Sequence, residues 1–216
     1  MTLNFDLFWS FRSPYSYLAT QRLVDMEKQW DLKIAVRPVY PIAVRDEAFF
    51  EKVNPLWPPY LFRDTIRIAE RLGIIYRWPN PDPVYMDPET GRYPKQQPYI
   101  YRLTRLGVAA TERGRGMSFI DEVSKVIWTG TENWHQGEHL ADAAKRAGLD
   151  LAELDAAIEA DESHYESAIQ QNQDALEQAG HWGVPCMVFE GEPFFGQDRL
   201  DDLLWRLQQQ GLEPRR

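Results

Sequence analysis

The segment 8–17 (Phe-Trp-Ser-Phe-Arg-Ser-Pro-Tyr-Ser-Tyr) joins two patterns of different period, and it constrains the fold more than any other part of the chain. Before it, apolar residues alternate with other residues over 3–9, which predicts a strand. After it, apolar residues recur at helical spacing over 14–29, and alternation returns over 32–37. Two strands joined by a helix form a βαβ unit, so we expect a parallel pair of strands with a right-handed crossover.

The middle of the chain has helical character, and strands return near its end. Expected helices cover 60–72, 95–114, 118–127, 137–147, 151–158 and 161–179. The run 186–189 predicts a strand, Glu190-Gly191 predicts a tight hairpin turn, and 193–195 predicts the returning strand. A last helix is expected from about 198 to 210.

The order βαβ, helical block, ββα is typical of an α/β, thioredoxin-like fold. We therefore expect a thioredoxin-like domain made of residues 1–44 and 180–216, with a large all-helical insertion domain over 45–179. Two proline-rich segments, 54–59 and 78–83, interrupt the helical block and predict stiff loops. They either space the helices or form an aromatic-lined wall over a pocket, and the sequence leaves both open.

Composition narrows the class of protein. The net charge of −9 in 216 residues argues against nucleic acid or an anionic membrane as the main partner. The chain has no long uninterrupted apolar run and no basic segment leading into one at its start, so we expect a cytoplasmic protein without a membrane span. Cys186, the single cysteine, fits a reducing compartment and excludes an intramolecular disulfide, and with it the function of a periplasmic disulfide oxidant.

Serines stand where a thioredoxin-type fold carries its redox cysteine pair. That fold places Cys-x-x-Cys at the junction between the first strand and helix, and here the two positions are Ser13 and Ser16. The site thus keeps the geometry of a thiol-handling fold without the thiols. This indicates a protein that binds the thiol of another molecule, with glutathione the first candidate.

Three segments carry a resemblance to a known family. They are 11–19 (FRSPYSYLA), 60–67 (YLFRDTIR, a Tyr-x-x-x-Asp-x-x-Arg helix) and 183–200, which contains GVPCMVF and FGQDRL. In combination they resemble the DsbA-like glutathione enzymes, namely kappa-class glutathione transferases and 2-hydroxychromene-2-carboxylate isomerases of aromatic catabolism. The resemblance implies glutathione as cofactor, a small aromatic acid or electrophile as substrate, and a homodimer. One departure is Trp57, which stands where the family usually has a lysine that helps to hold glutathione or an acidic substrate.

The resemblance also assigns roles to residues. Ser13 would be catalytic by donating a hydrogen bond to the sulfur of glutathione, in addition to capping the helix that begins with Pro14. The helix N-terminus adds partial positive charge that favours thiolate over thiol. Ser16, one turn into the helix, is expected to pack or to bond back to the helix.

The expected glutathione-binding residues come from three further places. Val184-Pro185 would be joined by a cis peptide bond and would pair, through the Val184 backbone, with the cysteine of glutathione as an added strand. Gly196, Gln197 and Asp198 open the last helix, where the γ-glutamyl end would bind; the simpler interpretation is that Asp198 is its N-cap. Asn54, in the first proline-rich segment, completes the set.

Two other sequence features are not expected to take part in the function. His135-Gln136-Gly137-Glu138-His139 matches a zinc-peptidase motif, but Gly137 predicts a turn and helix start, so we expect no metal site. Cys186 is expected to point into the core. The favoured function is a glutathione-dependent isomerase of the 2-hydroxychromene-2-carboxylate type. A glutathione transferase or peroxidase on the same site, and a non-catalytic thioredoxin-like chaperone or adaptor, are the alternatives.

Overall fold

A computed structural model describes residues 2–46, 48–89 and 92–215. Its centre is a four-stranded sheet in the order β2-β1-β3-β4. The strands are β1 (Leu3–Trp9), β2 (Leu32–Pro38), β3 (Cys186–Phe189) and β4 (Glu192–Phe195). β1 pairs with β2 in parallel, β3 pairs with β1 antiparallel, and β4 completes the hairpin with β3. The expected α/β, thioredoxin-like fold with a helical insertion is confirmed.

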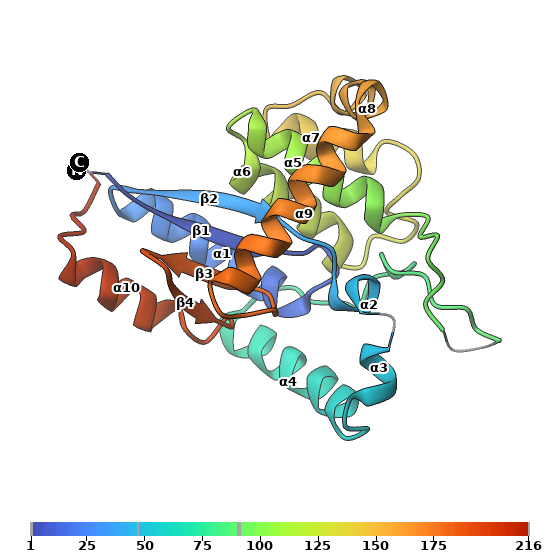
Figure 1. The fold of residues 1–216 in the computed structure, drawn as a ribbon, viewed down its shortest axis with the longest axis horizontal. Coiled ribbons are helices and arrows are strands. Elements are labelled where there is room, and N and C mark those ends of the chain that lie inside the picture. The colour runs from blue at the N-terminus through green and yellow to red at the C-terminus, as the bar shows by residue number, and fades with distance from the viewer. Residues whose placement is uncertain (1, 47, 90–91, 216) are drawn as a thin grey trace.

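Helices surround this sheet (Figure 1). They are α1 (Pro14–Gln29), α2 (Ile42–Arg45), α3 (Phe49–Lys52), α4 (Trp57–Leu72), α5 (Ile100–Glu112), α6 (Gly116–Trp128), α7 (His139–Arg146), α8 (Leu151–Ala160), α9 (Glu162–Gln178) and α10 (Leu200–Gln209). In Figure 1, α5 to α8 lie above the sheet and α3 and α4 lie below it. The helix α9 returns the chain from the upper group to the sheet, where Asn172 Nδ2 donates to Pro38 O at 3.0 Å.

The larger of two hydrophobic clusters among the described residues runs through the sheet and the helical insertion. The central strand β1 is buried on both faces toward its end, and its side chains share a cluster with those of α1, α5 and α6. A Cβ at Gly107 of α5 would lie 3.1 Å from both Phe11 and Pro38, closer than most real Cβ contacts, so the glycine favours the close approach of α5 to the end of the sheet. This approach fixes the insertion directly beside the junction between β1 and α1.

The hairpin between β3 and β4 turns as the sequence predicts. Glu190 and Gly191 both have positive φ, at 50° and 83°. Positive φ at both central residues is the geometry that matches the twist of a two-residue hairpin, and Gly191 adopts it without cost.

Two helices begin three or more residues away from the expected position. The helix expected over 95–114 begins only at Ile100, because the Gln97 side chain exchanges hydrogen bonds with the backbone N–H and C=O of Tyr85 and holds its own segment outside the helix. The helix expected from residue 60 begins at Trp57, because prolines are tolerated in a first turn whose N–H groups lack intrahelical partners. The short helices α2 and α3 were not expected.

No helix in the described ranges is both long and apolar enough to cross a bilayer.

Candidate functional site

Ser13 ends the turn after β1 and caps α1. Its N–H donates to Ser10 O at 3.1 Å, and its Oγ accepts a hydrogen bond from Ser16 N–H at 3.2 Å. Pro14 occupies the start of the helix, so the expected pairing of N-cap serine and first-turn proline is confirmed. The aligned peptide dipoles of α1 give its N-terminus partial positive charge beside the Ser13 hydroxyl.

Val184 lies directly across from Ser13. The Val184–Pro185 peptide bond is cis, which confirms the expectation. Ser13 Oγ donates to Val184 O over 3.2 Å, although the two residues are 171 positions apart. No acceptor in the described part of the chain takes the Val184 N–H. The Val184 backbone therefore offers an open donor next to a carbonyl that already contacts the serine.

The segment 196–199 lies on the other side of the proline. Gly196 N–H donates to Pro185 O at 2.9 Å, which ties this segment to the cis peptide. Gln197 is buried, and its Oε1 accepts from Arg22 Nη2 of α1 at 2.5 Å. Three of the places named from the sequence (Ser13, Val184-Pro185 and Gly196-Gln197) thus converge at one end of the sheet.

Asp198 is not the N-cap of α10, so that interpretation was wrong. The cap position is Arg199, and no side chain caps the helix. Gly196 has φ of +105°, and Arg199 N–H donates to Gly196 O at 3.2 Å, so a turn separates Asp198 from the helix. A Cβ at Gly196 would lie 2.5 Å from Asp198 Oδ1, so a side chain there would displace this carboxylate, and the positive φ favours glycine in any case. Asp198 stays exposed, 3.6 Å from the Arg199 guanidinium.

Ser16 is fully buried, and its hydroxyl has no hydrogen-bond partner among the described residues. The expectation that it packs inside is confirmed, whereas the alternative of bonding back to the helix is not. The Ser16 carbonyl accepts instead from Thr20 Oγ1 at 2.8 Å, and Thr20 accepts from Trp9 Nε1 at 3.0 Å. Of the two serines, Ser13 is the one that can meet a ligand.

A cavity of about 470 Å³ opens beside Ser13. Most of its lining is apolar, and it comes from the start of α1, from α2 to α4, and from the loop before β3. The residues lining it include Ser13, Tyr15, Ile42, Arg45, Phe49, Trp57, Leu61, Trp182, Val184 and Phe195. An apolar cavity with a few polar groups at defined points is the usual form of a small-molecule site.

A second cavity of about 630 Å³ continues from the first. The two share Arg12, Val53, Trp57 and Leu61. The second is also lined by Phe62, Trp78, Met86 and Tyr93. The two proline-rich segments thus supply aromatic side chains to one wall, which supports the aromatic-wall interpretation over simple spacing.

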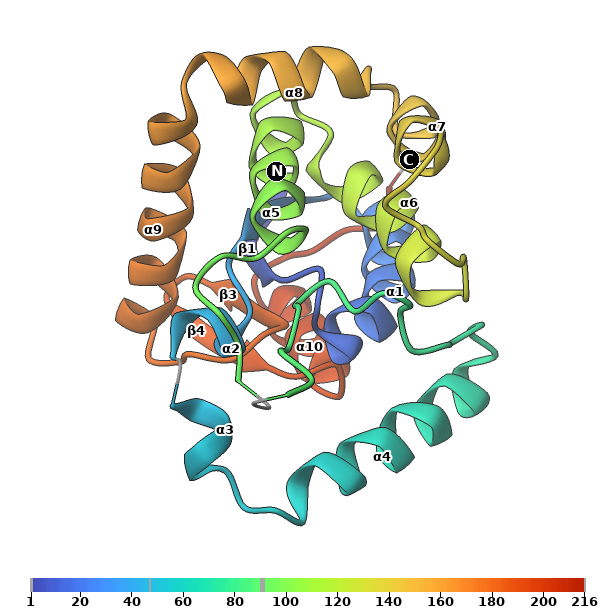
Figure 2. The same ribbon diagram turned by 90° about the vertical axis from the view of Figure 1, so that its right-hand side faces the viewer.

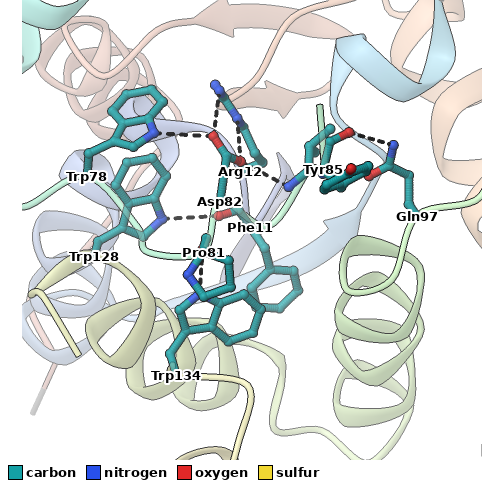
Figure 3. Close-up of polar contacts among 10 residues, drawn as sticks. Phe11, Arg12, Trp78, Pro81, Asp82, Tyr85, Gln97, Trp128 and Trp134 are labelled. Atoms are coloured by element: carbon teal, nitrogen blue, oxygen red, sulfur yellow. Dashed lines mark hydrogen bonds and ion pairs between the residues drawn. The ribbon is translucent and has the colours of Figure 1, made fainter. Parts of the chain in front are cut away.

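Arg12 holds the second proline-rich segment against the site (Figure 3). Its guanidinium makes two hydrogen bonds to Asp82, Nε to Oδ1 at 3.1 Å and Nη2 to Oδ2 at 2.9 Å, and lies 4.7 Å from the centre of the Trp78 ring. Trp78 Nε1 donates to the same carboxylate at 3.2 Å. Trp134 Nε1 donates to Pro81 O at 2.7 Å from the far side. These bonds hold the segment against Arg12, the residue before Ser13.

Asp64 ties α4 to the start of α1. Its carboxylate accepts from Tyr15 OH at 2.8 Å, from Arg67 Nη2 at 2.6 Å and from Tyr60 OH at 3.3 Å. Burial raises the pKa of Asp64, but the hydrogen bonds from Arg67 and Tyr15 outweigh it, so that this pKa lies below its usual value. Burial, together with the bond to Asp64, raises the pKa of the Tyr15 phenol. The 60–67 motif is therefore an anchor that places Tyr15 in the wall beside Ser13.

Three residues of the site were missed from the sequence. Arg12 and Tyr15 flank Ser13 and its proline in the motif, and that adjacency was an available signal. Arg45 lines the cavity from a helix of four residues, and no local pattern marks it.

Asn54 lies in the turn before α4 rather than in a cavity wall. Its Oδ1 accepts from Leu56 N–H at 3.0 Å, and its side chain is exposed, while its neighbours Val53 and Pro55 line the cavities. Trp57, at the position where the resemblance leads one to expect lysine, contributes an indole to both cavities. The missing cation is not replaced at that position.

The histidine motif lies outside the site. His135 is in the turn region before α7, and His139 is the first residue of that helix, as the glycine between them predicts. Within the described ranges, no group of three or more His, Cys, Asp or Glu side chains is arranged to hold a metal.

Cys186 is buried at the start of β3, which confirms the expectation. Burial raises the pKa of its thiol to about 11. A thiol that is buried and protonated is a poor nucleophile, so the chain has no thiol of its own ready for disulfide exchange.

Comparisons with known proteins agree with this geometry. The family model of the DsbA-like thioredoxin domain matches residues 4–208, so the chain belongs to that family. A search of curated protein sequences finds no match.

Solved structures show the same fold at low sequence identity. One is a 2-hydroxychromene-2-carboxylate isomerase, with a TM-score of 0.69 and 20% identity over 96% of this chain and 97% of that one. Another is the cytosolic disulfide reductase DsbM from Pseudomonas aeruginosa, solved with GSH, with a TM-score of 0.61 and 14% identity over 96% of this chain and 98% of that one.

Proposed function

We propose that this protein is a glutathione-dependent isomerase of the 2-hydroxychromene-2-carboxylate type, acting on a small aromatic acid. The observation that carries the proposal is the place of Ser13. Its hydroxyl caps a helix of 16 residues, lines a cavity and lies 3.2 Å from the carbonyl of Val184. A hydroxyl and a helix N-terminus together favour an anion at that point, and a thiolate is the anion that this fold handles.

The residues around Ser13 fit glutathione. Val184 has a backbone N–H without an acceptor in the described part of the chain, as strand-like pairing with a peptide requires. The exposed carboxylate of Asp198 suits the ammonium group of a γ-glutamyl end. Bound there, glutathione would supply a thiolate able to add reversibly to a conjugated double bond, which allows rotation about that bond before the thiolate leaves.

The chain's own residues would orient the substrate and favour the ionised form of the glutathione thiol. Ser13 would donate its hydrogen bond to the sulfur in place of Val184 O, since a hydroxyl has a single hydrogen to donate. The aromatic walls of the two cavities would hold a flat substrate against that sulfur and exclude water. The chain's single thiol is buried, so chemistry at this site would use a thiol brought from outside, and a cytoplasmic location, where glutathione is reduced, follows as part of the proposal.

A glutathione transferase of the kappa type is the second candidate, because it would use the same serine and the same aromatic wall. The product distinguishes the two activities: an isomerase releases glutathione unchanged, whereas a transferase leaves it attached. A non-catalytic adaptor would have no reason to lower the pKa of a thiol.

The deciding experiment is a titration of glutathione by ultraviolet difference spectroscopy on the purified protein. We expect thiolate absorbance to appear at a pH well below the pKa of free glutathione, and to saturate at one glutathione per chain. Absence of thiolate absorbance at saturating glutathione would contradict the proposal. Product analysis by mass spectrometry then separates isomerase from transferase.

A further inference from the structure

Arg45 carries a half-buried charge that the protein itself does not neutralise. Its Nη2 donates to the carbonyl of Trp182 at 2.7 Å, and its Nε is buried without a hydrogen-bond partner. No carboxylate in the described part of the chain forms an ion pair with it. Glu177 of α9 acts on it only through its longer-range field. Buried charges are normally paired, because desolvating an unpaired one is costly.

The other cations near this cavity are already paired. Arg12 lines the same cavity but is held by both oxygens of Asp82. Lys52 of α3 lies 3.9 Å from Asp46. Arg45 is therefore the charged group of this cavity wall that lacks a counter-ion within the described ranges.

The surroundings of Arg45 define the shape of a ligand. The helices α2, α3 and α4 follow one another around the lower left and the bottom of the molecule in Figure 2. In the cavity of about 470 Å³ that these helices help to line, Arg45 shares the lining with Phe49, Trp57 and Trp182, and with Ser13. A guanidinium among aromatic rings is suited to a flat ligand that carries a carboxylate, since its N–H groups match the two oxygens of that group.

We propose that Arg45 is the counter-ion for a carboxylate bound in this cavity, and so replaces the cation that Trp57 removes. The inference rests on the proposed function for the identity of the ligand. The carboxylate comes either from the glycyl end of glutathione or from the acid group of the aromatic substrate. Both sources share one chemistry, and matched pairs of probes separate them.

The experiment measures binding by calorimetry for two pairs of probes that differ in one negative charge. The first pair is glutathione and its glycyl ethyl ester, and the second is 2-naphthoate and 2-naphthamide. The parent protein should bind the carboxylate of at least one pair about 10- to 100-fold more tightly than the neutral partner, the range of a charge-assisted hydrogen bond. Arg45→Gln should abolish that preference, and Arg45→Lys should restore part of it.

The control variant is Arg113→Gln. Arg113 also donates to a backbone carbonyl, that of Ala109 at 2.9 Å, and has no ion pair in the described part of the chain, but it lies at the end of α5 away from the cavity. Its removal should leave every preference unchanged. A purely structural role of Arg45, through its bond to Trp182, would weaken charged and neutral probes alike.

Each outcome decides the question. Loss confined to the glutathione pair assigns the glycyl end, and loss confined to the naphthalene pair assigns the substrate acid. A parent that binds neutral and charged probes equally, or binds no carboxylate, overturns the proposal, as does an Arg45→Gln variant that keeps the preference. If glutathione does not bind at all, the proposed function fails, and the naphthalene pair still tests Arg45.

A measurement on the parent covers the case in which Arg45→Gln does not fold. Arginine-specific labelling with phenylglyoxal, read by peptide mass spectrometry, should modify Arg45 more slowly when 2-naphthoate or glutathione is present. The neutral partners should protect it less. Equal labelling with and without the carboxylate probes would contradict the proposal.

Discussion

Ser13 Oγ accepts a hydrogen bond from the Ser16 N–H at 3.2 Å, whereas the hydroxyl of Ser16 itself is buried without a partner. The two serines that replace a redox pair thus have unequal roles. Ser13 reaches the cavity and Val184, and Ser16 belongs to the core. This asymmetry gives a matched pair of substitutions at one motif.

The first prediction concerns the bound thiol. Ser13→Ala removes the donor proposed for the sulfur, so the pKa of bound glutathione should rise by about 1–2 units, the equivalent of about 1.5–3 kcal/mol for a hydrogen bond to a charged group. Ser16→Ala should leave that pKa unchanged. The measurement is thiolate absorbance against pH at saturating glutathione. An unchanged pKa in Ser13→Ala would show that the helix N-terminus, rather than the Ser13 hydroxyl, sets the pKa.

The second prediction concerns stability. Ser16→Ala removes a buried hydroxyl that has no partner in the described residues and also improves helix propensity, so the free energy of unfolding should rise by about 1 kcal/mol. In a chain of this length that corresponds to an increase in Tm of about 2–4 °C. Differential scanning calorimetry checks it. A Tm below that of the parent would mean that the hydroxyl is satisfied, for example by a bound water.

Local patterns were enough to predict the elements that place Ser13. The alternation of apolar residues predicted β1 and β2, and their helical spacing predicted α1. The serine before Pro14 predicted the N-cap of that helix. These features depend on residues that are close in the sequence, so they can be predicted without knowledge of the tertiary structure.

The features that the sequence did not reveal depend on distant contacts. Asp82 meets Arg12 across 70 positions, and Trp182 meets Arg45 across 137. The cap of α10 was misplaced because the turn at Gly196 depends on how Asp198 folds back over it. No periodicity encodes which side chains a fold brings together.

The third prediction concerns the wall beside Ser13. Asp82→Ala leaves the Arg12 guanidinium and the Trp78 indole without their shared acceptor, so the protein should lose about 2 kcal/mol of stability. Because the wall of the second cavity loosens, KM for the aromatic substrate should rise more than the Kd for glutathione. Calorimetry and steady-state kinetics measure the two effects.

Asp155→Ala is the control for that substitution. Asp155 of α8 accepts two hydrogen bonds from Arg102 of α5, from Nε to Oδ1 at 2.8 Å and from Nη2 to Oδ2 at 2.6 Å. This pair has the same geometry as Asp82 and Arg12 but lies away from both cavities. It should lower Tm without changing the ratio of KM to Kd. A change of that ratio in both variants would point to general loosening instead of a role for the wall.

The fourth prediction concerns pH. The pKa of Asp64 is lower in the folded protein than in the unfolded chain, so its ionisation stabilises the fold above the unfolded value of about 4, and this contribution is lost as the pH falls through the folded pKa. Asp64→Asn removes this contribution. Thermal unfolding from pH 7 down to pH 3 should therefore show a smaller loss of Tm in the variant than in the parent. Parallel curves would mean that the contacts with Tyr15 and Arg67 do not depend on the charge of Asp64.

The last prediction concerns the protein's own thiol. Because burial raises the pKa of Cys186 to about 11, the thiol stays protonated and covered at pH 8. A disulfide reagent should react with it only as fast as the protein opens, and the rate should rise with urea in step with unfolding. Cys186→Ala should keep full glutathione-dependent activity, at a modest cost in stability from the lost packing. If the folded protein reacted at the rate of a free thiol, or if the alanine variant lost activity while folded, the chemistry would belong to Cys186, and the role assigned to Ser13 would fall.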